Sequence, residues 1–510
     1  MTRLRKRLWT GLLAAQLFIG IASAAEAEEP LEAGSYASPL EKLQQLVGVN
    51  DHLHTDEVRY RESDGKLFHC SYTFGVIDAR DPAEMEYLAQ GLRHAIPGDD
   101  RKPGCIHLAW DGDTVYTTHR GNIDNPAFLT GWDLRPDPDD PQKIDPVQLP
   151  VLQEPGVSYE GVEVANGRIY VALHQGGLGI YERSAAGFQR VGALSGLSNA
   201  WGVRIRGATA FVADSLAGLA IVDVSDAARP RLLGRVETGG QARGLALDGD
   251  LVYVAAGSAG LVVVDASDLE GPVVIGRAEM PGSAIRVDSS DGLVAVAAWN
   301  DARVYDVSDP AAPRFLGAVR GTREINYAED GRPPVTSRTL GIAANGDSVF
   351  VGAWHVISSY RIHPDRAAPS IRLPEELNLI DFGPLSAGES ETFPLTVTNE
   401  GTAPLTLVEV STDNAAFEVE PRQARIAPGS TATLSITFTA GGEEQESGFL
   451  RIRSDDPLNP ERKGYLVANR PGVGVGKPLP ETTLALVDGG QWSSTDARGH
   501  VTLLAYFATF

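Results

Sequence analysis

Short apolar stretches fill the middle of the chain, and glycine, asparagine or aspartate bounds each of them. Alternation of apolar and polar residues predicts half-buried β-strands, and Asn-Gly or Asp-Gly pairs between two stretches predict hairpin turns. One unit is expected to hold four strands, at residues 203–205, 210–213, 219–224 and 231–234. Helix-period stripes of about ten or more residues are absent from the sequence. We therefore expect an all-β protein.

One phrase recurs along this region. Its three clearest copies lie at residues 218–226, 260–268 and 304–310. Their aspartates, Asp223, Asp265 and Asp306, are 42 and 41 residues apart. Weaker copies place other residues at the same point: Asp78, Asp133, Glu182 and Arg361. Seven copies with this period predict a seven-bladed β-propeller over residues 41–373, with four strands in each blade.

The repeated phrase also resembles a known family. Residues 221–226 read Ile-Val-Asp-Val-Ser-Asp, which is similar to the LVIVD repeat of mostly exported bacterial propellers. The resemblance covers about residues 58–373 and is most specific in the fourth to sixth copies. It implies a propeller that binds a ligand or a protein, and it carries over no catalytic residue.

The pattern changes after the propeller. Residues 380–383 and 396–405 begin a second series of short alternating strands, with frequent turn signals. This spacing predicts an immunoglobulin-like β-sandwich over residues 377–471. The phrases resemble choice-of-anchor D and Hydin-type domains, and the resemblance implies a structural or docking role without chemistry.

Residues 472–510 are expected to form a linker and an incomplete α/β fragment. Residues 484–490 and 496–510 resemble the opening of a thioredoxin-like redoxin domain, the family that includes peroxiredoxins. In that family a nucleophilic cysteine follows the strand that corresponds to residues 501–509. The expected nucleophile lies just after Phe510, so the sequence holds no catalytic residue of this kind. A selenocysteine codon read as a stop is one explanation, and an incomplete gene is the alternative.

The first residues predict export. Four basic residues precede an apolar run at residues 8–21, and small residues follow it. This layout is typical of a cleaved secretory signal peptide. We expect it at residues 1–24, with cleavage after residue 24 or 27. The run is too short to span a bilayer, so the sequence predicts a periplasmic or extracellular protein that does not span the membrane.

Two cysteines, Cys70 and Cys105, are present. The register places Cys70 at the end of the second strand of the first repeat and Cys105 before the inner strand of the second. These positions lie on one face of adjacent blades. In an oxidising compartment we expect a disulfide between them, and two buried free thiols are the alternative.

The charge limits the partners. The chain has 67 acidic and 44 basic residues, and its formal net charge is −23. This balance excludes a nucleic-acid-binding protein of the usual basic kind and argues against an anionic lipid surface. The expected partner is a protein or a small ligand at one face of the propeller.

Histidines provide the candidate metal ligands. Five of them are placed by register near one face of the propeller: His54, His69, His107, His119 and His174. Imidazoles around one end of a propeller could bind a transition metal. Ordinary polar histidines in loops are the alternative. The sequence suggests no other cofactor.

Three functions stay open. In the first, the propeller and the sandwich form a docking scaffold for a C-terminal redoxin domain that reduces disulfides or peroxides. In the second, the protein is a non-catalytic interaction scaffold. In the third, the histidine-rich face of the propeller binds a metal. Whether the protein is an enzyme therefore stays open.

Overall fold

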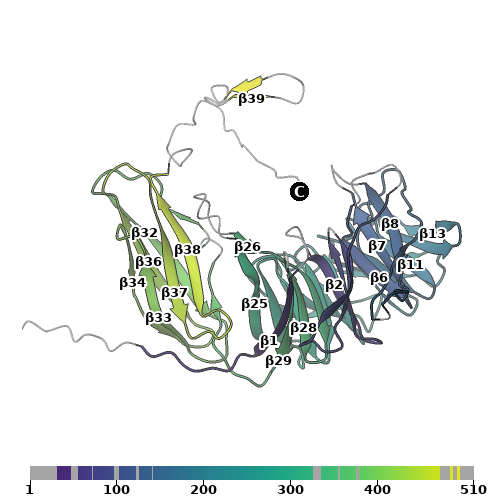
Figure 1. Ribbon diagram of the computed structural model, residues 1–510, viewed down its shortest axis with the longest axis horizontal. Coiled ribbons are helices and arrows are strands. Elements are labelled where there is room, and N and C mark those ends of the chain that lie inside the picture. The colour runs from purple at the N-terminus through teal and green to yellow at the C-terminus, as the bar shows by residue number, and fades with distance from the viewer. Residues whose placement is uncertain are drawn as a thin grey trace, which may run out of the picture.

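The computed structural model describes residues 31–47, 55–71, 73–96, 103–121, 126–140, 142–325, 335–353, 356–374, 377, 379–470, 483–485 and 491–493. The regular elements of this part are all β-strands. Figure 1 shows them as a large body of many sheets and a smaller body coloured green to yellow. No helix of the described residues is long and apolar enough to cross a membrane. The predicted all-β class is confirmed.

Seven sheets make up the large body, and the first three follow one another along the chain. The first contains β2 (Thr55–Arg61), β3 (Lys66–Ser71), β4 (Phe74–Asp78) and β5 (Glu86–Leu92). The second contains β6 (His107–Asp111), β7 (Thr114–Arg120), β8 (Ala127–Asp133) and β9 (Val147–Gln148). The third contains β10 (Val162–Ala165), β11 (Arg168–Ala172), β12 (Leu178–Ser184) and β13 (Gly187–Leu194).

The next three sheets continue this order. The fourth contains β14 (Gly202–Arg206), β15 (Thr209–Ala213), β16 (Leu219–Asp223) and β17 (Arg231–Val236). The fifth contains β18 (Gly244–Asp248), β19 (Leu251–Ala255), β20 (Leu261–Asp265) and β21 (Val273–Ala278). The sixth contains β22 (Arg286–Ser290), β23 (Leu293–Ala297), β24 (Asp301–Asp306), β25 (Arg314–Ile325) and β26 (Val335–Ser337).

The seventh sheet joins the two ends of the repeat region. It contains β27 (Thr339–Asn345), β28 (Ser348–Ala353), β29 (Val356–Ile362) and β1 (Leu40–Val47). β1 pairs antiparallel with β29, with Leu40 opposite Ile362. The first strands of neighbouring sheets contact one another, and β27 returns to β2. This closed ring of seven sheets is a β-propeller, and each sheet is one blade.

The recurring phrase has a local cause. Asp223, Asp265 and Asp306 end the third strands of their blades, and each accepts a hydrogen bond at 2.9 Å from the backbone N–H of the serine two residues later. These side chains close the turn to the fourth strand. Glycine in the phrase has another cause. A Cβ on Gly276 would lie 2.1 Å from the carbonyl oxygen of Pro310 in the next blade.

The smaller body is a two-sheet sandwich. One sheet has the order β30 (Ile371–Arg372), β32 (Ser390–Asn399), β36 (Thr431–Thr439) and β34 (Phe417–Glu420). The other has the order β31 (Ile380–Asp381), β38 (Glu461–Ala468), β37 (Glu446–Ser454), β33 (Leu405–Thr412) and β35 (Ala424–Ile426). Phe417 and Phe438 meet in its core with ring centres 4.9 Å apart. Because β30 pairs with β32, the predicted propeller end at residue 373 falls inside the sandwich.

Polar contacts join the two bodies. Arg303 of β24 is only 3% exposed, and it donates to Glu400 of the sandwich at 2.8 Å and to Asp301 at 3.2 Å. The segment before β1 also contacts the sandwich. The backbone N–H of Gly34 donates to Asp455, and the Tyr36 hydroxyl donates to the carbonyl oxygen of Pro404. Figure 1 shows this segment passing from the sandwich into the propeller.

Two predicted regions fall mostly outside the described residues. The signal peptide at residues 1–24 lies wholly outside them. Within residues 472–510 the described part is one hairpin, β39 (Thr483–Ala485) and β40 (Gln491–Ser493). The redoxin-like interpretation of this region stays a prediction.

Candidate functional site

Charged and aromatic side chains gather around the propeller axis, where the inner strands begin. We call this group the axial cluster, and its members are Asp56, Glu57, His107, Arg120, Glu160, His174, Trp201, Arg243 and Arg286. Each inner strand begins at this end, because the chain comes back to it from the outer strand of the previous blade. The cluster therefore combines residues from six blades that are far apart in sequence.

Asp56 enters the cluster through a β-bulge. Thr55 pairs with Ser71 and Glu57 with Cys70, so Asp56 is an extra residue in β2 without an opposite partner. Bulges of this kind change the direction of a side chain and are common beside binding sites. Burial raises the pKa of Asp56 to about 6, although the charges of Arg286 and Arg120 oppose the rise.

His107 lies between two buried carboxylates. Its Nδ1 is 3.5 Å from Glu57 Oε2, and its Nε2 is 3.2 Å from Glu160 Oε1. Glu57 also accepts the backbone N–H of Leu108 at 2.7 Å. Burial opposes ionisation of Glu57, but the nearby His107 outweighs it and lowers the pKa of Glu57 to about 2.

Glu160 connects several members of the cluster. It is 1% exposed, and its second carboxylate oxygen lies 3.0 Å from His174 Nε2. Arg120 approaches its first oxygen at 3.4 Å. Burial would raise the pKa of Glu160, but the hydrogen bonds from His107 and His174 lower it overall. A charged Glu160 thus links three neighbouring side chains.

Trp201 provides an aromatic surface in the cluster. The edge of its ring system meets His174 with ring centres 4.9 Å apart. The guanidinium of Arg243 lies over the indole at 4.9 Å, and that of Arg120 lies 6.0 Å away. His174 is held from its other side by Asn199, 3.0 Å from Nδ1. Cation–π contacts fix the orientation of such guanidinium groups.

A second charged layer lies further along the inner strands. Arg59 pairs with Glu163 at 3.2 Å, and Arg204 approaches the same carboxylate at 3.5 Å. Asp288 accepts the backbone N–H of Ala344 at 2.9 Å. The positive and negative charges of this layer neutralise one another, so the layer needs no ligand to account for its charged residues.

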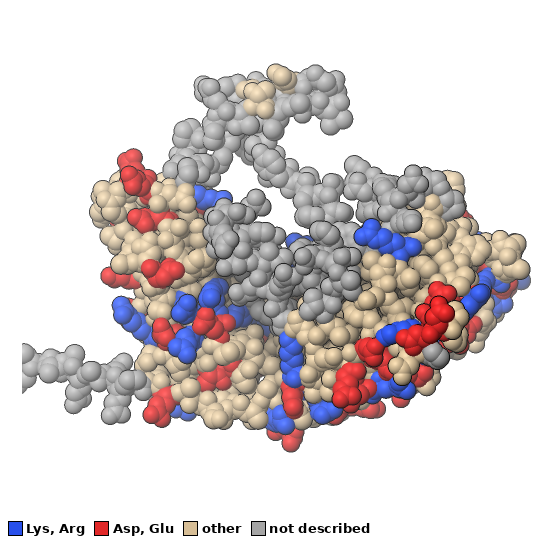
Figure 2. Space-filling model, in the orientation of Figure 1, with Lys and Arg blue, Asp and Glu red and all other residues tan. Residues whose placement is uncertain are grey.

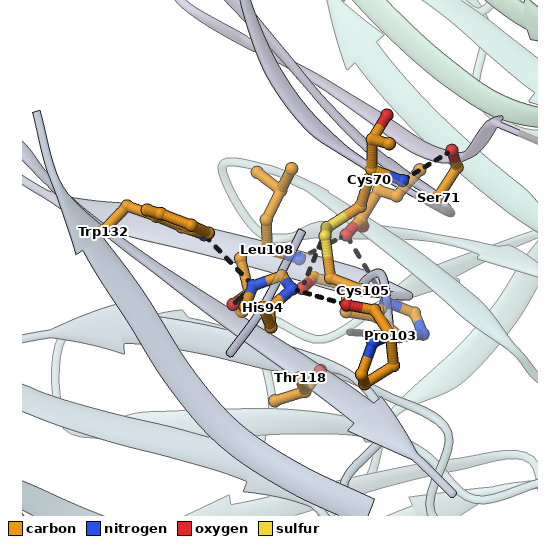
Figure 3. The surroundings of a disulfide bond; sticks show 12 residues. Cys70, Ser71, His94, Pro103, Cys105, Leu108, Thr118 and Trp132 are labelled. Atoms are coloured by element: carbon orange, nitrogen blue, oxygen red, sulfur yellow. Dashed lines mark hydrogen bonds and ion pairs between the residues drawn. A yellow bond between two sulfur atoms is a disulfide. The ribbon is translucent and has the colours of Figure 1, made fainter. Parts of the chain in front are cut away.

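A disulfide joins the first two blades (Figure 3). It lies beside the axial cluster, because Cys70 Sγ is 3.5 Å from the carbonyl oxygen of His107. The structure joins Cys70 and Cys105, whose Cα atoms are 5.2 Å apart. Cys70 is opposite Glu57 in the ladder, and Cys105 precedes His107 by two residues. The bond thus ties together the backbones that carry two members of the cluster. His94 lies beside it: its Nδ1 donates to the carbonyl oxygen of Pro103, and its Nε2 accepts the indole N–H of Trp132.

The predicted histidines separate into groups. His107 and His174 meet at Glu160, whereas His54 lies outside the described residues. His69 packs against Tyr87, and burial lowers its pKa to about 4. His119 stacks on Phe128 with a pKa also lowered to about 4 by burial. Among the described residues no group of three or more histidine, cysteine or acidic side chains is arranged to hold a metal, so a metal site stays a prediction.

A cavity of about 610 Å³ lies elsewhere, at the turns of the first two blades. Its lining is charged, and most of the charges are paired, for example Asp64 with Arg61, Asp78 with Arg80, and Glu86 with Lys143. Figure 2 shows acidic and basic side chains next to one another along this rim of the propeller. Such mutual pairing does not call for a ligand.

Family models match two parts of the chain. The LVIVD repeat matches residues 198–238, 239–279 and 281–320. The HYDIN/CFA65/VesB-like Ig-like domain matches residues 373–466. These matches confirm LVIVD repeats in the fourth to sixth blades and a Hydin-like sandwich after the propeller.

Solved structures with similar folds are more distant. The structure described as "Structure of U3-55K" has 12% sequence identity and a TM-score of 0.46, and the match covers 64% of this chain and 100% of that chain. "Crystal structure of RRP9 WD40 repeats" has 11% identity and a TM-score of 0.44, with 65% and 100% covered. A comparison with curated proteins found no match.

Several members of the cluster were not predicted from the sequence. They are Asp56, Glu57, Arg120, Glu160, Trp201, Arg243 and Arg286. A usable signal was present, because charged residues interrupt the apolar inner strands: Glu57 and Arg59 in β2, and Arg286 and Asp288 in β22. Charged side chains at inner-strand positions of a propeller face the axis and are buried there. Because burial of a charge destabilises a protein unless the charge is paired, such residues point to a site.

Proposed function

We propose that this protein is an exported binding scaffold whose propeller takes a ligand at the axial cluster. The supporting observation is the cluster itself, in which buried, mutually hydrogen-bonded carboxylates and histidines lie beside two arginines whose Nε atoms have no hydrogen-bond partner. The sandwich, joined to the sixth blade through Arg303 and Glu400, would hold the propeller in a fixed orientation. A propeller and an Ig-like domain suggest such a scaffold or binding role.

The disulfide supports export. A bond between Cys70 and Cys105 persists in oxidising compartments and is rare in the cytosol. It agrees with the signal peptide expected at residues 1–24, which would direct the chain to the periplasm or the extracellular space. Fractionation of cells that produce the whole chain tests this: export predicts shortened protein outside the cytoplasm, and full-length cytoplasmic protein would contradict it.

Binding is tested by thermal unfolding of the whole chain with a panel of small acids, amines, sugars and short peptides. A ligand at a hundred times its Kd stabilises the folded state by about 2.7 kcal/mol. We expect at least one compound to raise Tm in the unaltered chain but not in Trp201→Ala, which removes the aromatic surface of the cluster. Lys143→Gln, in the rim cavity, is the control and should keep the effect. Equal shifts in all three proteins, or none in any, would contradict the proposal.

A further inference from the structure

Two arginines of the axial cluster, Arg243 and Arg286, form no direct ion pair with a carboxylate of the described residues. Arg243 donates through Nη2 to Gln241 at 2.9 Å, and Arg286 Nη2 contacts His107 Nε2 at 3.1 Å. The Nε atoms of both are buried without a hydrogen-bond partner. Carboxylates interact with them only at longer range: Arg286 with Asp56 and Glu57, and Arg243 with Glu160. Other arginines of the propeller are paired, such as Arg235 with Asp214 at 3.2 Å.

This arrangement is costly without a ligand. A buried donor without an acceptor destabilises a protein by about 1 to 3 kcal/mol. Arg120 and Arg243 lie 6.0 and 4.9 Å from the same Trp201 ring. Burial, and then the charges of Arg286 and Arg120, lower the pKa of Arg243, although the charge of Glu160 opposes this. Arg120 is balanced by Glu160. The other two have no carboxylate of the described residues in direct contact.

His107 has two contacts that conflict. Its Nε2 atom lies 3.2 Å from Glu160 and 3.1 Å from Arg286. A protonated Nε2 suits the carboxylate and repels the guanidinium, whereas an unprotonated Nε2 does the reverse. An acceptor that drew the Arg286 guanidinium away would leave His107 free to donate to Glu160. A carboxylate bound to Arg286 would therefore remove this conflict.

The surroundings favour an organic carboxylate. A guanidinium binds a planar carboxylate through two parallel hydrogen bonds. The negative charges of Asp56, Glu57 and Glu160 in the same cluster disfavour a dianion such as phosphate. The indole of Trp201, already covered by Arg243 on one side, offers apolar surface for the carbon atoms of a ligand.

We propose that Arg243 and Arg286 form a binding site for the carboxylate group of a small organic monoacid, with Trp201 against its apolar part. The inference rests on the proposed function, since it names the ligand class of the same cluster. The carboxylate would accept hydrogen bonds from both guanidinium groups, including the two Nε donors that have no acceptor.

Calorimetric titration of the whole chain tests the ligand class. The probes are acetate, hexanoate and benzoate, with benzamide as the neutral equivalent of benzoate and phosphate as the dianion. We expect saturable binding of at least one carboxylate, and binding of benzamide and phosphate weaker by tenfold or more. Phosphate binding tighter than that of all three carboxylates, equal binding of benzoate and benzamide, or no carboxylate binding would overturn the inference.

Variants assign the site. Arg286→Gln and Arg243→Gln should each weaken carboxylate binding by tenfold or more, while circular dichroism shows an unchanged fold. Arg286→Lys keeps the charge but not the two-pronged geometry, and it should lose affinity too. Arg206→Gln, at the opposite end of β14, is the matched control and should bind normally. Carboxylate binding that survives Arg286→Gln and Arg243→Gln would overturn the inference. Cluster-dependent binding of amines or sugars alone would also overturn it, yet would leave the proposed function standing.

Discussion

The fourth to sixth blades and the first three blades share the same order of strands, but they differ in the spacing of the repeat and in the polar residues that they carry. In the fourth to sixth blades the repeated phrase returns after 42 and 41 residues, and the LVIVD matches fall on these blades. The first three have longer spacings of 55 and 49 residues between their marker acids. They supply most of the axial cluster: Asp56, Glu57, His107, Arg120, Glu160 and His174. Regular repeats thus build the ring, and the departures from the repeat carry its polar groups.

One turn position carries a different residue in each of four successive blades. His174, Ser215, Gly257 and Trp299 occupy equivalent turns, and each makes an isolated bridge to the following blade. All four have positive φ, between 50° and 66°. Glycine adopts this conformation readily, but bulky side chains do so at a cost. The third blade accepts this cost at His174, where the side chain reaches Glu160, and the sixth blade accepts it at Trp299.

The largest effect is expected in the regular blades. Phe211 of β15 is fully buried between the fourth and fifth blades. Phe211→Ala removes this packing and leaves a cavity, so we expect the free energy of unfolding to fall by about 3 to 5 kcal/mol. Denaturant-induced unfolding measures it, and Leu216→Ala, at a residue that is 70% exposed, is the control. A loss below about 1 kcal/mol would show that repeat packing does not hold the ring.

The disulfide should have the next largest effect, because it links the first two blades covalently. A bond that closes a separation of 35 residues stabilises by about 3 to 4 kcal/mol in the chain-entropy model. We expect the double variant Cys70→Ser, Cys105→Ser to lose about this amount. Thiol titration of unfolded, unreduced protein comes first, and two free thiols there would refute the disulfide.

A substitution in the axial cluster, Asp56→Asn, should instead raise the free energy of unfolding. Folded Asp56 keeps its proton up to about pH 6, whereas the unfolded chain releases it near its ordinary pKa of 3.8. Stability therefore falls as pH rises between these values, and the penalty is complete above about pH 6. Asp56→Asn removes it, so we expect a gain of about 1 to 3 kcal/mol at pH 8 and little gain at pH 4.

Unfolding curves at both pH values measure this gain. The exposed Asp139 provides the control, since Asp139→Asn should change stability little at either pH. Destabilisation by Asp56→Asn at pH 8 would mean that the charged form of Asp56 is stabilised in the folded protein, contrary to its burial.

The smallest effect concerns the turn of the repeated phrase. Asp306 accepts the backbone N–H of Ser308 and pairs with Arg314. Asp306→Ala should lower the free energy of unfolding by about 1 kcal/mol. The loss is small because water replaces much of the lost hydrogen bond and ion pair. Chemical denaturation detects it, with Ser308→Ala as a control that keeps the backbone donor. A loss as large as that of Phe211→Ala would mean that turns, not packing, dominate the regular blades.

Local chemistry explains what could be predicted from the sequence. The marker acids identified the third strands because an aspartate that closes a turn acts within a few residues of itself. The pairing of β1 with β29 was not predicted, since it joins distant segments and residues 40–47 lack the phrase. The cluster was missed for the same reason. His107 and His174 were noticed as histidines, but Glu160, which joins them, looks like any surface acid in sequence.

The strand β1 has a consequence for how the molecule is made. The first described strand of the propeller can complete its blade only after β29, the last, has been synthesised. The middle blades have all their strands close together in the chain, so they can form as they emerge. Until β1 pairs with β29 the seventh blade is incomplete, and its open sheet edge is prone to pair with other chains. Ring closure is thus a late, long-range step, and folding yield should depend on how quickly it follows synthesis.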